Sequence, residues 1–177
     1  MKKIFIYLTL ILTFFSLFLT GCNHSRSINK EKDAIEEEYI KRYEAGKDIT
    51  ILDKYYIEDK IILLYQEGNK YVVDYCSKDD EENILKNISK YSWQKETDEA
   101  VSVKCFGTDM DDFVIIVFQN EDIFSKTHKL TITIEDIALE NIDASKKEMI
   151  IKLPSRPIKY NNLSVVLYDK NGNTIKY

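Results

Sequence analysis

One segment of this chain brings three carboxylates together. Asp109, Asp111 and Asp112 stand just before a long apolar run. Carboxylate oxygens grouped in this way can bind Ca²⁺, and a pair of carboxylates can act as acid and base in catalysis. Their spacing differs from that of an EF-hand loop, whose ligands alternate around a central glycine. We therefore favour an acidic loop between two strands. The alternative is a Ca²⁺-dependent or enzymatic domain that uses the Asp109–Asp112 loop.

Two further polar segments resemble sites less closely. Like charges are packed so tightly in Asp79-Asp80-Glu81-Glu82 that a solvated surface is favoured. Asp169, Asn171 and Asn173 match the start of a Ca²⁺ loop, but Thr174 stands where that loop needs its glycine. The second segment therefore predicts a hairpin turn.

The chain contains two histidines. His24 lies two residues after Cys22, and His128 lies in a loop ahead of a predicted strand, so we interpret both as solvated side chains. The sequence has no metalloprotease, nucleophile-elbow or P-loop pattern. We therefore predict no catalytic residues, no metal and no cofactor.

Aromatic residues are the remaining candidates for a binding surface, because the chain has 12 tyrosines. Those in predicted loops or irregular segments are Tyr55, Tyr56, Tyr91, Trp93 and Tyr160. An exposed group of them would suit a carbohydrate or a protein partner. The alternative is that these tyrosines are half-buried strand residues, as β propensity alone predicts.

The N-terminus carries the most specific motif. Met1-Lys2-Lys3 is basic, Ile4–Leu19 is apolar, and Leu19-Thr20-Gly21-Cys22 follows at once. This arrangement resembles the bacterial lipoprotein signal peptide and its lipobox. The resemblance implies a diacylglyceryl group (palmitate or similar acyl chains) on the Cys22 thiol and cleavage between Gly21 and Cys22. Two acyl chains hold a protein stably on a membrane, whereas one holds it weakly.

Two other interpretations of this segment stay open. One is an uncleaved membrane anchor, for which the apolar run is short. An ordinary secretory signal would end in an A-x-A pattern, which is missing. We predict a signal peptide over 1–21, the lipidated cysteine and a polar tether over 22–32, and a single helix-plus-β domain over 33–177, with 33–106 and 107–177 as candidate sub-units.

Charge limits the partners of this domain. The chain has 25 basic and 30 acidic residues, a formal net charge of −5. A nucleic-acid partner would call for a basic surface, so we expect none. We expect lipid anchoring to the extracytoplasmic face of the cell membrane through Cys22, with a protein or cell-wall component as partner.

Two cysteines remain once Cys22 is lipidated. Cys76 and Cys105 each lie in or at the end of a predicted strand. Outside the cell they could form a disulfide, and the alternative is two separate thiols of which at least one is buried. The distance between their Cα atoms decides between the two, and sequence does not provide it.

The first half of the domain begins with helical periodicity. Ile35, Tyr39 and Tyr43 recur every four residues between Asp33, a capping residue, and Gly46, so we predict an amphipathic helix. A β-hairpin is predicted next, over 61–65 and 71–75 with a turn at Gly68. The segment 77–93 is ambiguous between a short helix and a strand that ends near Trp93.

The second half alternates with a period of two. Strands are predicted around 101–105, 113–118, 130–134, 149–153 and 163–167. The run Phe113–Phe118 is apolar throughout, as in a central strand buried on both faces. Asn171-Gly172 is typical of a hairpin turn. The fold class expected is mainly β: an antiparallel β-sandwich-like domain with an N-terminal amphipathic helix, α+β overall.

This order of strands, with the closing segment Val165–Asn173, is similar to that of small uncharacterised lipoproteins of low-GC Gram-positive bacteria. The resemblance implies localisation and fold, and no activity. We expect a non-catalytic binding or interaction module. The alternative is an immunity or inhibitor lipoprotein that protects its own cell from a secreted toxin.

Overall fold

The computed structural model describes residues 37–38, 41, 46–58, 60–79, 84–96, 98–108, 111–154 and 162–177, with the backbone alone at 78–79 and 84–85. Contacts divide the chain into two compact units, 1–46 and 47–177. The predicted signal peptide, the predicted tether and most of the predicted helix after Asp33 lie outside the described residues. Within the described ranges, no helix has the length and apolar character needed to cross a membrane.

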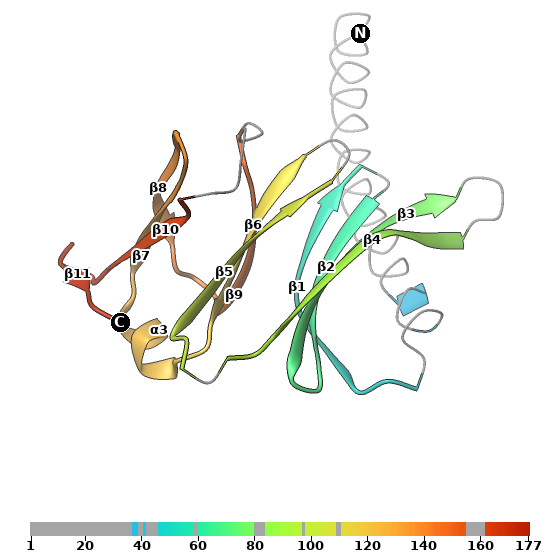
Figure 1. Ribbon diagram of the computed structural model, residues 1–177, viewed down its shortest axis with the longest axis horizontal. Helices are drawn as coiled ribbons and strands as arrows, with labels where there is room; N and C mark the ends of the chain where they lie inside the picture. The colour runs from blue at the N-terminus through green and yellow to red at the C-terminus, as the bar shows by residue number, and fades with distance from the viewer. Residues whose placement is uncertain are drawn as a thin grey trace, which may run out of the picture. The chain divides into compact units, whose positions relative to one another are not determined.

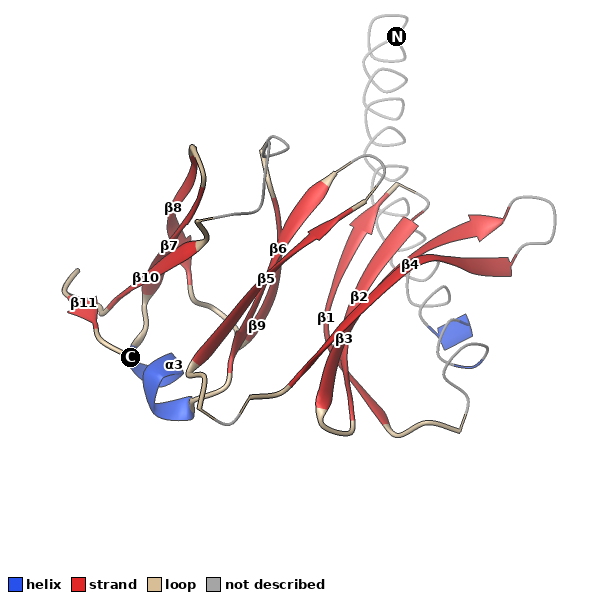
Figure 2. Cartoon of the chain, viewed as in Figure 1, coloured by secondary structure: helices blue, strands red, loops and turns tan. Residues whose placement is uncertain are grey.

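Residues 47–177 form three antiparallel sheets (Figures 1 and 2). Sheet A has the order β1-β2-β3-β4, and its strands are β1 (Ile49–Ile57), β2 (Lys60–Glu67), β3 (Lys70–Asp79) and β4 (Ile84–Gln94). Sheet B has the order β5-β6-β9, with β5 (Val101–Gly107), β6 (Asp112–Phe118) and β9 (Glu148–Lys152). Sheet C has the order β11-β10-β7-β8, with β7 (Lys129–Ile134), β8 (Ile137–Asp143), β10 (Ser164–Tyr168) and β11 (Thr174–Ile175). The expectation of a mainly β, antiparallel domain is confirmed.

Sheet A contains the predicted hairpin. β2 pairs with β3 from Lys60↔Ser77 to Glu67↔Lys70, and Gly68 at the turn has φ 58, a conformation that glycine adopts without strain. The ambiguous segment is a strand, because β4 pairs with β3 from Asp79↔Ile84 to Lys70↔Gln94. Its isoleucines, tyrosine and tryptophan favour a strand, and the neighbouring edge of β3 supplies the hydrogen bonds.

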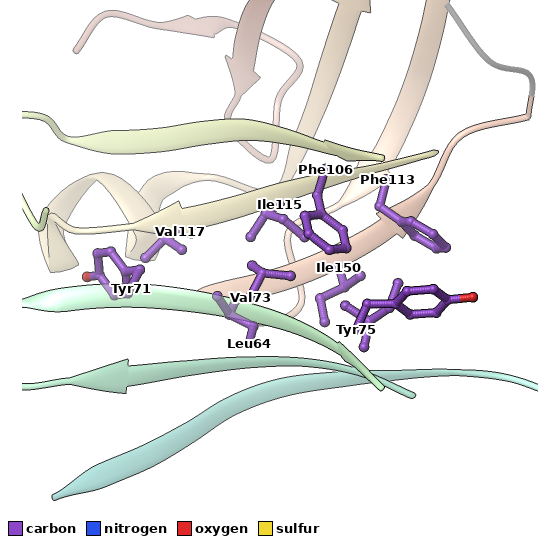
Figure 3. Close-up of a cluster of buried hydrophobic side chains, with 10 residues drawn as sticks. Leu64, Tyr71, Val73, Tyr75, Phe106, Phe113, Ile115, Val117 and Ile150 are labelled. Atoms are coloured by element: carbon purple, nitrogen blue, oxygen red, sulfur yellow. The ribbon is translucent and has the colours of Figure 1, made fainter. Parts of the chain in front are cut away.

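Sheet B is the middle layer, and β6 is buried along its whole length, as the apolar run predicted. Phe113, Ile115 and Val117 pack with sheet A in one core (Figure 3). The alternate residues Val114, Ile116 and Phe118 pack with sheet C in a second core. Because side chains alternate across a strand, β6 supplies three residues to each core. The fold therefore has two apolar interfaces where a simple sandwich has one.

Cys76 and Cys105 are not joined by a disulfide. Cys76 is buried in β3 of sheet A, whereas Cys105 in β5 packs against the core shared by sheets B and C. Cys105 thus points away from sheet A, because the core between sheets A and B is filled from the other face of β5 by residues such as Phe106. Of the two alternatives left open by the sequence, the structure has the separate thiols.

Three elements were not predicted: helix α3 (Glu121–Lys126), β8 and β1, whose Tyr55 and Tyr56 were expected in a loop or irregular segment. Helix α3 has six residues, too few for a clear apolar period, and begins at Asn120, whose side chain accepts hydrogen bonds from the backbone N–H groups of Asp122 and Ile123. Strand β8 has Ile137 and Leu139 on one face, but the next inward residue is Ile142. That extra residue breaks the alternation by which strands are recognised in sequence.

The segments 33–106 and 107–177 are the candidate sub-units of the predicted domain. The structure groups 47–177 as one compact unit, and β5 pairs with β6 across the junction, with Phe106 opposite Phe113. The N-terminal part of the first sub-unit lies outside the described residues.

Candidate functional site

An open, mostly polar cleft of about 700 Å³ lies on sheet C. Its walls come from three strands and one turn. The lining residues are His128, Lys129, Thr131, Glu140, Asn141, Tyr168, Asp169, Lys170, Asn171 and Gly172.

Strand alternation explains why these side chains face away from the core. In β7, Leu130, Ile132 and Ile134 are buried, so Lys129 and Thr131 between them project from the opposite face. Tyr168 of β10 is paired with Lys129, and its neighbour Leu167 is buried, so Tyr168 lies on the same outer face. The cleft is therefore built on the outer face of sheet C.

A β-bulge forms one wall of the cleft. Leu130 pairs with Ile142 and Ile132 pairs with Leu139, which sets Glu140 and Asn141 opposite the single residue Thr131. Asn141 has φ 57, a left-handed conformation that costs about 1 kcal/mol or more for a residue other than glycine. Bulges of this kind redirect side chains and occur often beside functional sites. Here the bulge turns two adjacent polar residues toward the cleft.

The opposite wall is the β10–β11 turn, which Asp169 organises. Its Oδ1 accepts hydrogen bonds from the backbone N–H groups of Asn171 and Asn173, each at 2.8 Å, and its Oδ2 accepts one from Asn173 Nδ2 at 3.1 Å. These bonds, led by the Asn173 side chain, lower the pKa of the Asp169 carboxyl. Gly172 has φ 81 at the tip of the turn. The predicted hairpin turn is confirmed, and the Asp169 oxygens bind its backbone.

The chemistry of the cleft is that of hydrogen bonding. One aromatic ring, that of Tyr168, lies among polar side chains. These are the carboxylates of Glu140 and Asp169, the amides of Asn141 and Asn171, lysine ammonium groups, a threonine hydroxyl and the exposed His128 imidazole. Such a mixture of donors and acceptors beside an aromatic face suits a ligand rich in hydroxyl groups. No group of three metal-ligating side chains occurs among the residues that the structure describes.

The carboxylate group at Asp109–Asp112 lies at the β5–β6 connection, away from the cleft-forming strands. Asp111 bonds Lys152 Nζ at 2.8 Å, and its backbone forms a turn with Thr108. Asp112 is buried at the start of β6, and Asp109 lies outside the described residues. The Asp79–Glu82 run, except for the backbone of Asp79, lies outside them too.

Tyr55 and Tyr91, two of the candidate aromatic residues, lie on strands at opposite edges of sheet A. Tyr55 in β1 packs into the first core, with its ring 5.4 Å from that of Phe113. Tyr91 stacks on Trp93 at 5.7 Å in β4, which is the opposite edge of sheet A from β1. Trp93 is half-buried and donates a hydrogen bond to Ser102 Oγ at 3.1 Å. Tyr160, like Gly21, Cys22 and His24, lies outside the described residues.

The sequence pointed to four lining residues, His128 as a solvated loop histidine and Asp169, Asn171 and Gly172 as residues of a hairpin turn. The structure does place His128 exposed ahead of β7. Sequence reasoning missed the cleft partners Lys129, Glu140, Asn141 and Tyr168. The alternation of polar and apolar residues in β7 indicates that its polar side chains line an outer surface, and this was the available sequence signal. No local pattern predicts that β7 pairs with both β8 and β10, and it is this pairing that brings the lining residues together.

A second polar cluster lies in sheet A. Asp74 in β3 is fully buried, and its Oδ2 accepts a hydrogen bond from Tyr65 Oη at 2.9 Å. Lys90 Nζ lies 3.5 Å from the same oxygen and 2.7 Å from Tyr65 Oη. Burial raises the pKa of the Asp74 carboxyl above its ordinary value of 3.8, and Lys90 offsets part of that rise.

This shift predicts a pH dependence with a definite sign. The folded state binds the Asp74 proton more tightly than the unfolded chain does, so the contribution of Asp74 to the free energy of unfolding falls as pH rises. Asp74→Asn removes the charge and keeps an acceptor for Tyr65. We expect the variant's free energy of unfolding, minus that of the wild type, to increase between about pH 4 and pH 7.

Urea unfolding followed by the fluorescence of Trp93, the single tryptophan, measures this difference. Asp122→Asn is the control, because Asp122 is exposed and its ion pair is with Lys126 of the same helix. A difference that decreases with pH would contradict the assignment.

Comparison of the chain with protein-family models, with curated proteins and with solved structures gave no match. The candidate site therefore depends on the geometry described above.

Proposed function

We propose that this chain is a lipid-anchored extracytoplasmic binding module, without catalytic activity of its own, whose cleft on sheet C binds a hydroxyl-rich ligand such as a glycan of the cell envelope. The observation that carries the proposal is the cleft, with Tyr168 surrounded by hydrogen-bonding side chains from three strands.

The proposed lipid anchor at Cys22 supports a ligand in the cell envelope. Leu19-Thr20-Gly21-Cys22 resembles a lipobox, and two acyl chains on Cys22 would hold the domain at the extracytoplasmic face of the cell membrane. Envelope glycans are the abundant hydroxyl-rich polymers within reach of a domain tethered there.

The construction of the cleft supports binding. Its outer-face residues do not contribute to either core, yet the bulge at Glu140 and Asn141 retains a left-handed backbone there. Strain of this kind persists where the surrounding structure imposes it, and it commonly accompanies a ligand site. The turn bonded by Asp169 keeps the opposite wall in place, which lowers the entropic cost of binding.

Titration calorimetry of the detergent-solubilised full chain with soluble oligosaccharides from bacterial cell wall tests the proposal. We expect binding that the double variant His128→Ala/Tyr168→Ala weakens by about tenfold or more, since it removes the aromatic face and one polar partner.

Thr133→Ala is the matched control. Thr133 lies on the same strand, does not line the cleft, and is paired with Ser164. We expect this variant to bind as the wild type does. If the double variant is folded, as its unfolding transition will show, and binds as tightly as the wild type, the ligand binds to another surface. If the wild type does not bind the oligosaccharides at millimolar concentration, the proposal of a glycan ligand is wrong.

A further inference from the structure

The chain contains one Asn-Gly pair, Asn171-Gly172, and this pair lies at the tip of the β10–β11 turn. Both residues are exposed, and both line the cleft of sheet C. The space beside Gly172 is open, because a Cβ atom at this position would have no neighbour within 4 Å beyond the adjacent residues. No other part of the described chain therefore shields this peptide bond.

An exposed Asn-Gly pair can react within itself. The Gly172 nitrogen attacks Cγ of the Asn171 side-chain amide, so that an N–Cγ bond forms and the Cγ–Nδ2 bond breaks. The amide group leaves as ammonia with the proton of the Gly172 N–H, and a succinimide ring results. Water opens this ring at either carbonyl to give aspartate or isoaspartate, without oxidation or reduction. Glycine favours the attack because it has no side chain to crowd the nitrogen.

Hydrogen bonds of the turn oppose this reaction. The Gly172 N–H donates to the backbone carbonyl of Asp169 at 3.0 Å, so the attacking nitrogen keeps its proton while the turn is closed. Asp169 Oδ1 accepts from the backbone N–H groups of Asn171 and Asn173, each at 2.8 Å. The turn must open before the nitrogen attacks, and each hydrogen bond that breaks first slows the reaction by about fivefold.

We infer that Asn171 is a site of spontaneous deamidation, restrained by the hydrogen bonds that Asp169 makes within the β10–β11 turn. Asn173 provides an internal comparison, because it is also exposed and its backbone N–H bonds the same carboxylate. Thr174 follows it, and a β-branched side chain crowds the nitrogen that would have to attack. Asn173 therefore keeps its amide.

Deamidation changes the wall of the cleft. It replaces the Asn171 amide, which donates hydrogen bonds, by a carboxylate in a cleft that already contains those of Glu140 and Asp169. Isoaspartate also adds a methylene group to the backbone of the turn. We expect the modified chain to bind cell-wall oligosaccharides more weakly than the fresh chain. This consequence rests on the function proposed above, whereas the deamidation does not.

The experiment incubates the detergent-solubilised full chain at neutral and at mildly alkaline pH. Peptide mapping by mass spectrometry measures deamidation at Asn171 and Asn173, and a fresh sample digested in parallel corrects for reaction during digestion. We expect Asn171 to be converted, with isoaspartate among its products, and Asn173 to remain. Conversion should be faster at the higher pH, because the Gly172 nitrogen attacks after losing its proton.

Loosening the turn tests the restraint. Asp169→Ala should be deamidated at Asn171 about fivefold faster or more than the wild type, since it removes the side-chain hydrogen bonds of the turn. Asp122→Ala, at an exposed aspartate of α3, should react as the wild type does. The wild type in guanidinium chloride, where the turn is absent, should be converted fastest, and this comparison does not depend on the folding of a variant.

Three outcomes would overturn the inference. Asn171 that stays intact in the wild type and in Asp169→Ala would exclude the site, and equal rates in the folded and denatured wild type would exclude the restraint. Equal conversion of Asn173 would remove the role of Gly172. A fresh chain that binds no oligosaccharide but is deamidated at Asn171 would refute the proposed function and support the modification site.

Discussion

Replacing Cys22 with alanine will abolish the incorporation of radiolabelled palmitate into this protein. The lipobox resemblance assigns the thioether to this thiol, and alanine has no sulfur to carry the acyl group. In the lipoproteins that this motif resembles, cleavage follows lipidation, so we expect the variant also to keep residues 1–21. Mass spectrometry of the purified chain then shows an unprocessed N-terminus in the variant and a lipidated Cys22 in the wild type.

The control for this prediction is Cys105→Ala, which removes a half-buried thiol that packs against the second core. Its labelling should match that of the wild type. A wild-type chain that takes up no palmitate and keeps residues 1–21 would favour an uncleaved anchor. A wild-type chain cut elsewhere and unlabelled would favour an ordinary secretory signal.

Truncating Phe118 at the end of β6 will destabilise both cores together. Phe118 is 1% exposed, packs in the core between sheets B and C, and lies 5.3 Å from the Phe124 ring of α3. Phe118→Ala should lower the free energy of unfolding by about 3–5 kcal/mol, the usual cost of removing a buried phenylalanine. That is a large fraction of the total stability of a typical domain.

The position of Trp93 makes this prediction informative. Trp93 packs against the first core, on the other face of sheet B from Phe118. Because β6 supplies alternate side chains to both cores, we expect Phe118→Ala to shift the Trp93 fluorescence transition and the far-ultraviolet circular dichroism transition in urea equally. Lys126→Ala, an exposed residue of α3, should shift neither by more than about 0.5 kcal/mol. A Trp93 transition left in place while the circular dichroism transition moves would show that the two cores unfold separately.

Local patterns predicted the strands well where the alternation was intact. Leu130, Ile132 and Ile134 are the buried face of β7, and the apolar run from Phe113 to Phe118 is the strand buried on both sides. Patterns failed where one residue interrupts the period. The bulge at Glu140 and Asn141 concealed β8, and the six residues of α3 are too few to show a helical period.

The candidate site was less predictable than the strands. His128 and Asp169 were both noted in the sequence, but as a solvated histidine and a turn residue. They line one cleft because β10 pairs with β7, so that Tyr168 stands opposite Lys129 although 39 residues separate them in the chain. Strand pairing also separates residues that the sequence grouped as candidates, since Tyr55 and Tyr91 lie on strands at opposite edges of sheet A.

The sequence by itself determined most of the strands, where the Gly68 and Gly172 turns fall, and which residue could carry lipid, because each depends on residues close together in the chain. Only the tertiary structure decided that β6 is shared by two cores, that Cys76 and Cys105 face different layers, and that β4 stands at an edge. Those features depend on which strands pair and which faces pack. Many pairings satisfy the same local alternation, and the choice among them is made by burial summed over the whole domain.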